Sequence, residues 1–192
     1  MMKSLTDIEL VERLKVNDTK AFEELVERYK NMGFSLAYNM SGSVEDAQDI
    51  SQEAFVIVHS QIHKFRGESS FKTWFYRIIV NLCRGHYRKN RFASFISINF
   101  FTKEGDEKTI DAVAETTPEN ELSTKQLGSA IKNAVKNLPV KQQEVFVMKH
   151  FNGMKISEIS EVLGCAEGTV KSHLFRAVKK LQEKLKGFYN AV

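Results

Sequence analysis

The chain has 192 residues, 28 of them Lys or Arg and 24 Asp or Glu, which gives a formal net charge of +4 at pH 7. This length leaves room for one domain or two small ones, and at so modest a net charge the placement of the cations matters more than their sum. Two distant cysteines exclude a disulfide framework, and Cys83-x-x-His86 lacks the second ligand pair of a structural zinc site. The sequence offers no apolar run of about 20 residues and no signal peptide. We therefore expect a cytoplasmic protein with no membrane insertion, no metal and no cofactor.

The N-terminal part of the sequence predicts a compact bundle of three helices. The capping box Thr6-x-x-Glu9 opens a short first helix, and a long second helix ends near Gly42. Ser43 is the expected N-cap of a third helix, which runs from Val44 to about Ile62. The expected inward positions are Ile8, Val11 and Leu14, then Phe22, Leu25, Val26, Tyr29, Leu36, Ala37 and Met40, then Ala47, Ile50, Ala54, Val58 and Ile62.

The outward face of the third predicted helix is acidic. Asp46, Asp49 and Glu53 are spaced by three and four residues and form one stripe, with Gln52 beside it. Like charges at this spacing destabilise a helix by roughly a few tenths of a kcal/mol per pair. The stripe is either solvated and partly compensated by the helix N-terminus, which favours acids, or it is a docking face for a basic partner.

The segment Phe65–Arg91 combines many cations with interleaved aromatic residues and holds a single acid, Glu68. Ser70 can cap a helix from Phe71 to about Lys89. One polar stripe of that helix would hold Thr73, Arg77, Asn81, Arg84 and Arg88. Cations that follow a backbone, beside an amide that reads a base edge and rings that stack, suit single-stranded DNA. Aromatic residues at helical spacing are nevertheless more often core than stacking platforms, and here they are Phe71, Trp74 and Phe75.

From Phe92 to Glu121 the periodicity fails and acidic residues accumulate around Pro118. This composition predicts an extended acidic linker. The run Phe92–Phe101 is an exception, because it is apolar and yet too short to span a membrane. It could pack on a domain, cover the basic face or meet a partner, and the sequence leaves these alternatives open.

The C-terminal part predicts a helix from about Leu122, another that starts at Pro139 and runs to Phe151, and then a helix-turn-helix over Met154–Leu185 with its break at Gly164. The buried stripe of the last helix would be Val170, Leu174, Val178, Leu181 and Leu185. Its other face is basic and hydrogen-bonding, which suits the DNA major groove, about 12 Å wide. An ordinary amphipathic helix with solvated lysines is the alternative.

Four segments together resemble one family, the extracytoplasmic-function (ECF) sigma factors of bacterial RNA polymerase. GTVKSHLFRA (168–177) is similar to the recognition helix of the family's fourth conserved region, and LPVKQQEVFVMKHFNGMKISEIS (138–160) is similar to the entry into that region. DAQDISQEAF (46–55) resembles the polymerase-docking part of the second region, with Gln48 and Ile50 as mild departures, and on this resemblance we favour docking for the acidic stripe. FRGESSFKTWFYRIIVNLCR (65–84) resembles the segment that melts the −10 promoter element. The resemblance covers nearly the whole chain, in the family's order.

The resemblance implies an all-α fold of two small helical domains: residues 1–91 as sigma region 2, 92–121 as a linker and 122–192 as sigma region 4. It implies an alternative sigma factor, not itself an enzyme, that binds the clamp coiled coil and flap of core RNA polymerase and promoter DNA, both duplex and single-stranded. An anti-sigma factor is a further expected partner. The implied polymerase contacts are Asp46, Asp49, Gln52, Glu53 and Phe55. The implied −10 contacts are Lys64, Phe65, Arg66, Ser69, Phe71, Trp74, Arg77, Asn81, Arg84 and Arg88. The implied −35 contacts are Thr169, Lys171, Ser172, His173, Phe175, Arg176 and Lys179.

Three residues of the C-terminal part depart from the family pattern. Lys155 stands where a Ser or Thr cap is common and Ser160 where Ala is usual; a missing cap costs about 1 kcal/mol. His173 replaces an Arg, and a neutral imidazole cannot make the bidentate guanine contact of a guanidinium.

Two other classes of protein are alternatives. A free-standing helix-turn-helix regulator with an N-terminal sensor or oligomerisation domain would share the DNA-reading helix but has no use for the basic aromatic one. An enzyme finds little support, because the sequence holds no phosphate-binding loop and no spaced nucleophile, base and acid. His59 and His63 have metal-ligand spacing but lack the Glu of a zincin motif.

Overall fold

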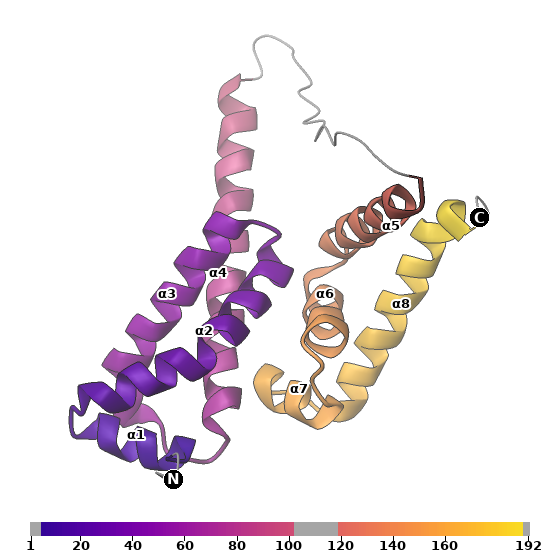
Figure 1. The fold of residues 1–192 in the computed structure, drawn as a ribbon. Helices are drawn as coiled ribbons and strands as arrows, with labels where there is room; N and C mark the ends of the chain where they lie inside the picture. The colour runs from indigo at the N-terminus through magenta and orange to yellow at the C-terminus, as the bar shows by residue number, and fades with distance from the viewer. Residues whose placement is uncertain (1–4, 102–118, 190–192) are drawn as a thin grey trace.

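The structure is a computed structural model that describes the backbone of residues 5–101 and 119–189 and the side chains of residues 5–89 and 128–186. Regular structure within those residues is helical throughout, as the sequence predicted. The elements are α1 (Asp7–Lys15), α2 (Thr19–Ser41), α3 (Val44–Gln61), η1 (Ile62–Lys64), α4 (Phe71–Phe101), α5 (Glu119–Lys136), α6 (Val140–Phe146), η2 (Val147–Phe151), α7 (Ile156–Leu163) and α8 (Glu167–Tyr189). Figure 1 shows them as two groups, α1–α4 and α5–α8, that lie side by side. No helix in the described ranges is both long and apolar enough to cross a membrane.

The helix boundaries of the first group follow from the predicted caps. Thr6 and Glu9 form both halves of the capping box of α1. Gly42 ends α2 in the left-handed conformation, at φ 74°, where a Cβ would be strained. The Ser43 hydroxyl then accepts a hydrogen bond of 3.2 Å from the Asp46 amide and begins α3. Short-range chemistry thus sets the ends of these helices.

Replacing Ser43 by Ala is expected to lower the free energy of unfolding by about 1 kcal/mol, because the Asp46 amide loses its acceptor. Chemical denaturation followed by circular dichroism measures the loss. Ser60→Ala is the matched control, since the Ser60 hydroxyl only bonds the Ile57 carbonyl of its own helix. A Ser43→Ala protein as stable as the control would contradict the capping role.

An aromatic cluster fills the centre of the first group. The Phe75 ring lies 4.8 Å from that of Phe55 and 5.8 Å from that of Tyr29, and it is fully buried. Gly33 lets α2 and α4 approach here, because a Cβ at this position would lie 2.9 Å from Phe75 Cζ. One expected core residue is not there: Ile8 is 73% exposed, since only the opposite side of α1 faces the bundle.

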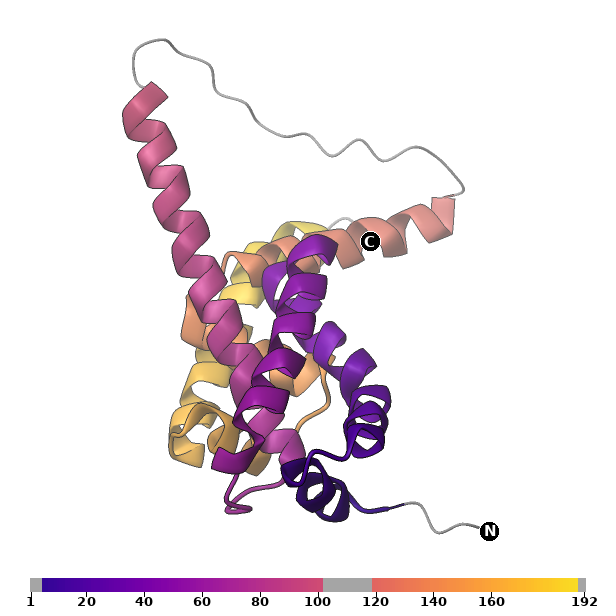
Figure 2. The same cartoon turned by 90° about the vertical axis from the view of Figure 1, so that its left-hand side faces the viewer.

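Helix α4 is longer than predicted. It continues past Lys89 to Phe101, and Figure 2 shows its last turns projecting beyond both groups. From His86 to Phe101 the sequence contains neither Gly nor Pro, so nothing local stops the helix. The predicted linker therefore begins within a helix. The side chains of the apolar run Phe92–Phe101 and the segment 102–118 lie outside the described residues, and so the predicted roles of that run stay open.

The second group contains the predicted helix-turn-helix. Gly164 ends α7 in the left-handed conformation, at φ 64°. The stripe of α8 is confirmed, with Val170, Ala177 and Leu181 buried and Leu174 and Val178 partly so. The predicted helix from Pro139 to Phe151 instead ends in a wide π turn, η2. A buried core links these helices: Ala134, Val135, Leu138, Val145, Val147, Met148, Met154, Ile159 and Val162.

The two departures at α7 are partly compensated. A lysine side chain has no acceptor to cap a helix, but the Glu158 carboxylate accepts from the Lys155 amide at 2.7 Å, and this bond lowers the pKa of Glu158. The Ser160 hydroxyl donates to the Ser157 carbonyl at 2.7 Å. Half a capping box therefore survives, and the extra hydroxyl is satisfied within the helix.

Candidate nucleic-acid interface

The acidic stripe lies on the open side of α3. Asp49, Gln52 and Glu53 are exposed, because Ala47, Ile50 and Ala54 hold the opposite side of the helix in the core. Asp46 is half-buried near the helix N-terminus, with its Oδ1 3.6 Å from His86 Nδ1. We name Asp46, Asp49, Gln52 and Glu53 the acidic face.

Two apolar side chains alter the expectation for this face. Phe55 is buried, and its ring packs between those of Phe22 and Phe75, so the predicted polymerase contact is instead a core residue. Val56 is 66% exposed and follows Glu53 by three residues on the same face. Val56 was not predicted as part of this face, although its helical spacing from Gln52 and Glu53 places it there.

The loop between η1 and α4 forms one wall of a cleft against α1. Lys64 and Arg66 are exposed, Ser69 is partly exposed, and Gly67 adopts a positive φ of 74°. Arg66, Gly67 and Ser69 line the cleft from the loop, and Ile8 lines it from α1. The unexpected exposure of Ile8 thus gives this cleft an apolar floor.

The aromatic residues beside this loop are mainly structural. Phe65 and Phe71 are buried, with ring centroids 6.3 Å apart, and Phe71 lies 5.0 Å from Tyr29. Trp74 is only half-buried and lies 5.2 Å from Phe65. The predicted base contacts of Phe65 and Phe71 are therefore mostly taken by the core, because Phe71 packs against Tyr29 and Phe75, and Phe65 packs against Phe71 and Trp74. Trp74 keeps part of its surface.

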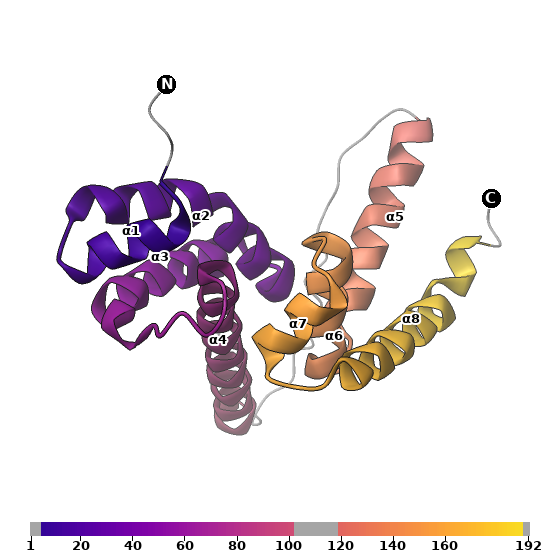
Figure 3. The ribbon, with the colours of Figure 1, turned by 90° about the horizontal axis from the view of Figure 1, so that it is seen from below.

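The polar stripe of α4 divides into two parts. Asn81 and Arg88 are exposed, whereas Arg77 and Arg84 turn toward the second group of helices and Thr73 is buried against it. Figure 3 shows α4 and α7 next to each other, with α8 beyond α7. The predicted −10 contacts Arg77, Asn81, Arg84 and Arg88 therefore share helix α4, but only some of them face solvent.

Hydrogen bonds join the turned part of the stripe to α6 and α7. Arg84 Nε and Nη2 donate to the two carboxylate oxygens of Glu144 at 2.5 and 2.8 Å, which raises the pKa of Arg84. Arg77 Nε and Nη2 donate to the backbone carbonyl of Glu161 at 2.9 and 2.6 Å. Lys72 Nζ lies 3.4 Å from the Glu158 carboxylate. We name these contacts the α4 seam.

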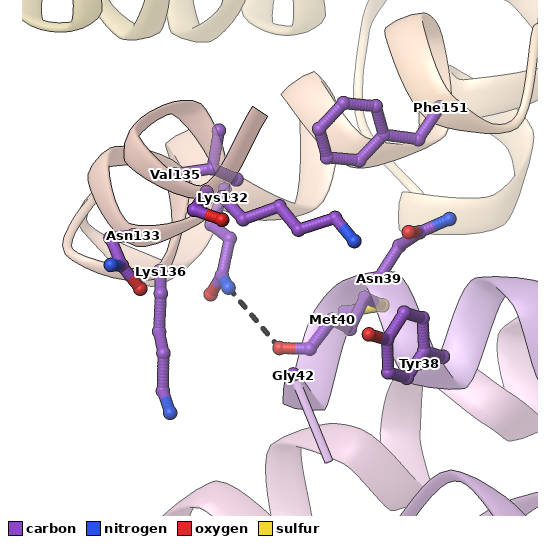
Figure 4. Close-up of a pocket in the computed structure, with 11 residues that line it drawn as sticks. Tyr38, Asn39, Met40, Gly42, Lys132, Asn133, Val135, Lys136 and Phe151 are labelled. Atoms are coloured by element: carbon purple, nitrogen blue, oxygen red, sulfur yellow. Dashed lines mark hydrogen bonds between the residues drawn. The ribbon is translucent and has the colours of Figure 1, made fainter. Parts of the chain in front are cut away.

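A second part of the boundary lies at the end of α2. Gln143 Nε2 donates to the Met40 carbonyl at 3.1 Å, and Lys132 Nζ lies 5.5 Å from the centre of the Tyr38 ring. Figure 4 shows the pocket here, with Tyr38 and Met40 on one side and Lys132 and Phe151 on the other. Polar contacts and apolar side chains both contribute to this boundary, where Met40, Val135 and Phe151 also line the pocket.

The face of α8 that lies away from its buried stripe is exposed to solvent. Thr169, Lys171, Ser172, Arg176 and Lys179 are exposed, and Phe175 is 72% exposed. His173 is only half-buried, and its Nδ1 has no hydrogen-bond partner among the described residues. Figures 1 and 3 place α6 and α7 between this helix and α4. This basic face of α8 is therefore separate from the α4 seam.

Glu144 is a second residue of this region that the sequence did not reveal. Its carboxylate is 0% exposed, and its cationic partners are Arg84 and, at 3.8 Å, Lys141. Within KQQEVF it reads as one more polar position of a helix, and its partner lies far away in the sequence. Only the packing of the two groups identifies it. The imidazole of His59, a residue with metal-ligand spacing in the sequence, packs edge-on against the Phe22 ring, with the two ring centroids 5.1 Å apart.

Comparisons with known proteins assign both groups. Residues 25–93 match the family Sigma-70 region 2, and residues 129–181 match Sigma-70, region 4. The chain is 32% identical over 200 residues to the ECF RNA polymerase sigma-E factor of Haemophilus influenzae, covering 96% of this chain and 98% of that one. It is 32% identical over 177 residues to the ECF RNA polymerase sigma factor SigW of Bacillus subtilis, covering 92% and 95%.

Two solved structures share the fold. CnrH in complex with the cytosolic domain of CnrY has a TM-score of 0.66 and 21% identity, covering 93% of this chain and 96% of that one. The sigma factor RpoE of Bartonella quintana, in complex with the anti-sigma factor NepR, has a TM-score of 0.60 and 21% identity, covering 87% and 98%. The fold and the paired matches are those of a two-domain sigma factor.

The chain belongs to the ECF RNA polymerase sigma factors. It is an alternative sigma factor that binds core RNA polymerase and promoter DNA and directs transcription initiation, and sigma factors are regulatory, non-catalytic proteins. The predicted alternative, a free-standing regulator with a sensor domain, is not supported, because residues 25–93 match region 2.

Proposed function

We propose that residues 1–91 dock on core polymerase and melt the −10 element, that residues 122–192 read the −35 element, and that residues 92–121 connect them. The observation that carries this proposal is the presence of two exposed faces of opposite charge on separate groups of helices. The acidic face of α3 suits a basic polymerase surface, since opposite potentials steer and orient association. The basic face of α8 suits duplex DNA.

Roles follow from side-chain chemistry at the exposed positions. Arg176 can contact a guanine with two hydrogen bonds, and Lys171 and Lys179 suit phosphates. In the first domain, Asn81 offers an amide that can read a base edge, and Arg88 offers a cation to the strand backbone. The cleft lined by Arg66 and Ser69 has the polar and apolar groups needed to hold a flipped base.

We also propose a cellular location and a further partner. We infer that the protein works in the cytoplasm, where core polymerase and promoter DNA are found, and that it catalyses no reaction by itself. An anti-sigma factor is a proposed partner, supported by the fold shared with sigma factors solved in such complexes. An anti-sigma factor would be recovered as a protein that co-purifies with this chain from unstressed cells. Recovery of the chain bound only to polymerase would contradict it.

The experiment that tests the function is transcription in vitro. Core polymerase with this chain is given fragmented genomic DNA, and the new transcripts are sequenced. We expect discrete start sites that share −35 and −10 elements, none without core, and little binding to promoter duplex by the chain alone. Random start sites, or equally specific DNA binding without core, would contradict the proposal.

A further inference from the structure

A pocket lies where the end of α2 meets the second group of helices. Its volume is about 280 Å³, close to the lower end of the roughly 300–1,000 Å³ of small-molecule sites. Both groups of helices line it, through residues that include Tyr38, Asn39, Met40, Lys132, Gln143 and Phe151. We propose that this boundary pocket is a binding site for a small aromatic anion, a flat ring system that carries a carboxylate or a phosphate.

The charges around the boundary pocket favour an anion. Among the described residues that line it, Lys132 and Lys136 are charged and none is acidic. The Lys132 ammonium lies 5.5 Å from the centre of the Tyr38 ring, and in Figure 4 it points into the space between Tyr38 and Phe151. The other polar groups of the lining are amides and hydroxyls, which can donate hydrogen bonds to an anion. An ammonium group beside such donors, with no carboxylate to compete, recognises a carboxylate or a phosphate by charge-assisted hydrogen bonds.

The apolar walls of the pocket favour a flat ring over an aliphatic chain. Figure 4 shows the Phe151 ring on one side of the pocket and the Tyr38 ring and Met40 thioether on the other. Aromatic rings attract a further ring at centroid distances of about 4.5–7 Å, and thioethers make favourable contacts with ring edges. A pocket of this volume admits roughly one or two rings together with their acidic group. The acidic side chain of a protein would bring the charge without the ring.

The turn that presents Phe151 is an independent indication of a site. η2 is a π turn over Val147–Phe151, and such turns are rare in proteins and frequently lie at functional sites. Val147 and Met148 of this turn are fully buried, whereas Phe151 at its end is 37% exposed and lines the pocket. The Phe146 ring packs edge-on against Phe151, with the two ring centroids 5.8 Å apart. An irregular turn therefore places an aromatic ring at the pocket instead of in the core.

The boundary pocket depends on both groups of helices. Its Tyr38 ring and Met40 thioether come from α2, and its lysines and Phe151 come from the second group. None of the residues proposed to contact polymerase or DNA is among the described residues that line it. The pocket therefore suits an effector that is neither polymerase nor DNA and that touches both domains at once.

The test uses the full-length protein with ¹³C-labelled methionine methyl groups, followed by NMR. The chain has six methionines, of which Met40 lines the pocket, whereas Met32 and Met154 do not and serve as control signals. Loss of one signal in Met40→Leu identifies the Met40 methyl group. The aromatic anions used as probes are benzoate, indole-3-acetate and adenosine monophosphate. They are compared with indole-3-acetamide, which is neutral, and with glutarate, an aliphatic anion.

We expect at least one aromatic anion to shift the Met40 signal saturably, with a dissociation constant of about 0.1–1 mM, while the control signals stay unchanged. Lys132→Gln should weaken binding of that anion about tenfold and leave indole-3-acetamide unaffected, because only the charge is lost. Phe151→Leu should weaken it about fivefold, because one ring contact is lost. The matched control is Lys184→Gln, which removes an exposed lysine of α8 outside the pocket and should change no affinity.

A Met40 signal that no aromatic anion moves at concentrations up to about 10 mM would overturn the inference. Equal affinity for indole-3-acetamide and indole-3-acetate, or equal affinity of Lys132→Gln and Lys184→Gln for the anion, would overturn it as well. Glutarate that binds as tightly as the aromatic anions would remove the ring from the recognition and indicate the acidic side chain of a protein partner instead. These measurements use neither DNA nor polymerase, so their outcome is independent of the proposed function.

Discussion

Reversing Asp49 or Glu53 to Lys is expected to weaken binding to core RNA polymerase by about 2 kcal/mol or more, roughly 30-fold, if the acidic face meets basic side chains there. Both residues are exposed, and within the described part of the chain neither forms an ion pair. Their charge is therefore free to serve a partner, and its reversal turns attraction into repulsion. Fluorescence anisotropy of labelled protein titrated with core measures the change.

The matched control is Glu23→Lys, the same charge reversal at an exposed position of α2. It should keep the affinity of the parent protein to within about 0.5 kcal/mol, as expected of a surface change outside an interface. Helical content by circular dichroism should be the same in all variants, because Ala47, Ile50 and Ala54 still hold α3 in the core. Equal affinity of the Asp49→Lys and parent proteins for core would refute the docking role of this face.

The second large effect separates the two DNA-contacting domains. Arg176→Ala is expected to weaken recruitment to duplex promoter by about 1–3 kcal/mol through a lost base contact, whereas Lys171→Ala should chiefly lower the salt dependence. Asn81→Ala should leave recruitment largely intact, because Asn81 lies on α4 and not on α8. Its defect should appear in opening of the −10 element and in discrimination of the −10 sequence.

Permanganate footprinting of the −10 region, beside a duplex-binding assay with core present, measures the two steps. A promoter with a pre-melted −10 bubble should restore part of the activity of a variant that only opens DNA poorly. It should not rescue Arg176→Ala, whose defect precedes opening. If Asn81→Ala and Arg176→Ala lost binding and opening in the same proportion, the assignment of separate roles to the two domains would be wrong.

Short-range signals in the sequence predicted most of the fold. Ser43 as a cap and Gly42 and Gly164 as left-handed ends are local features, and the stripe of α8 is a simple periodicity. The length of α4 was underestimated because the periodic pattern weakens after Lys89, although no residue there breaks a helix. Ile8 was assigned to the core because it lies at helical spacing, although the bundle contacts only one side of α1.

The candidate site was predicted less completely, for a physical reason. A motif identifies residues that a family has in common, but it does not show which of them are buried in the core. Phe55, Phe65 and Phe71 were predicted contacts and are buried among other rings. Glu144 was not predicted because its role depends on an ion pair with Arg84, which is far away in the chain. Contacts between domains leave no periodic pattern in the sequence from which they could be predicted.

The Arg84–Glu144 pair also affects which nucleic acids the protein can bind before it joins core polymerase. Phosphate contacts carry no sequence information, so an uncovered basic helix would bind messenger RNA and the exposed strands of replicating DNA as readily as a promoter. Such nucleic acids greatly outnumber promoters in a bacterial cell. In this structure Arg84 instead donates two hydrogen bonds to the Glu144 carboxylate of its own chain, so this guanidinium is already occupied by an anion.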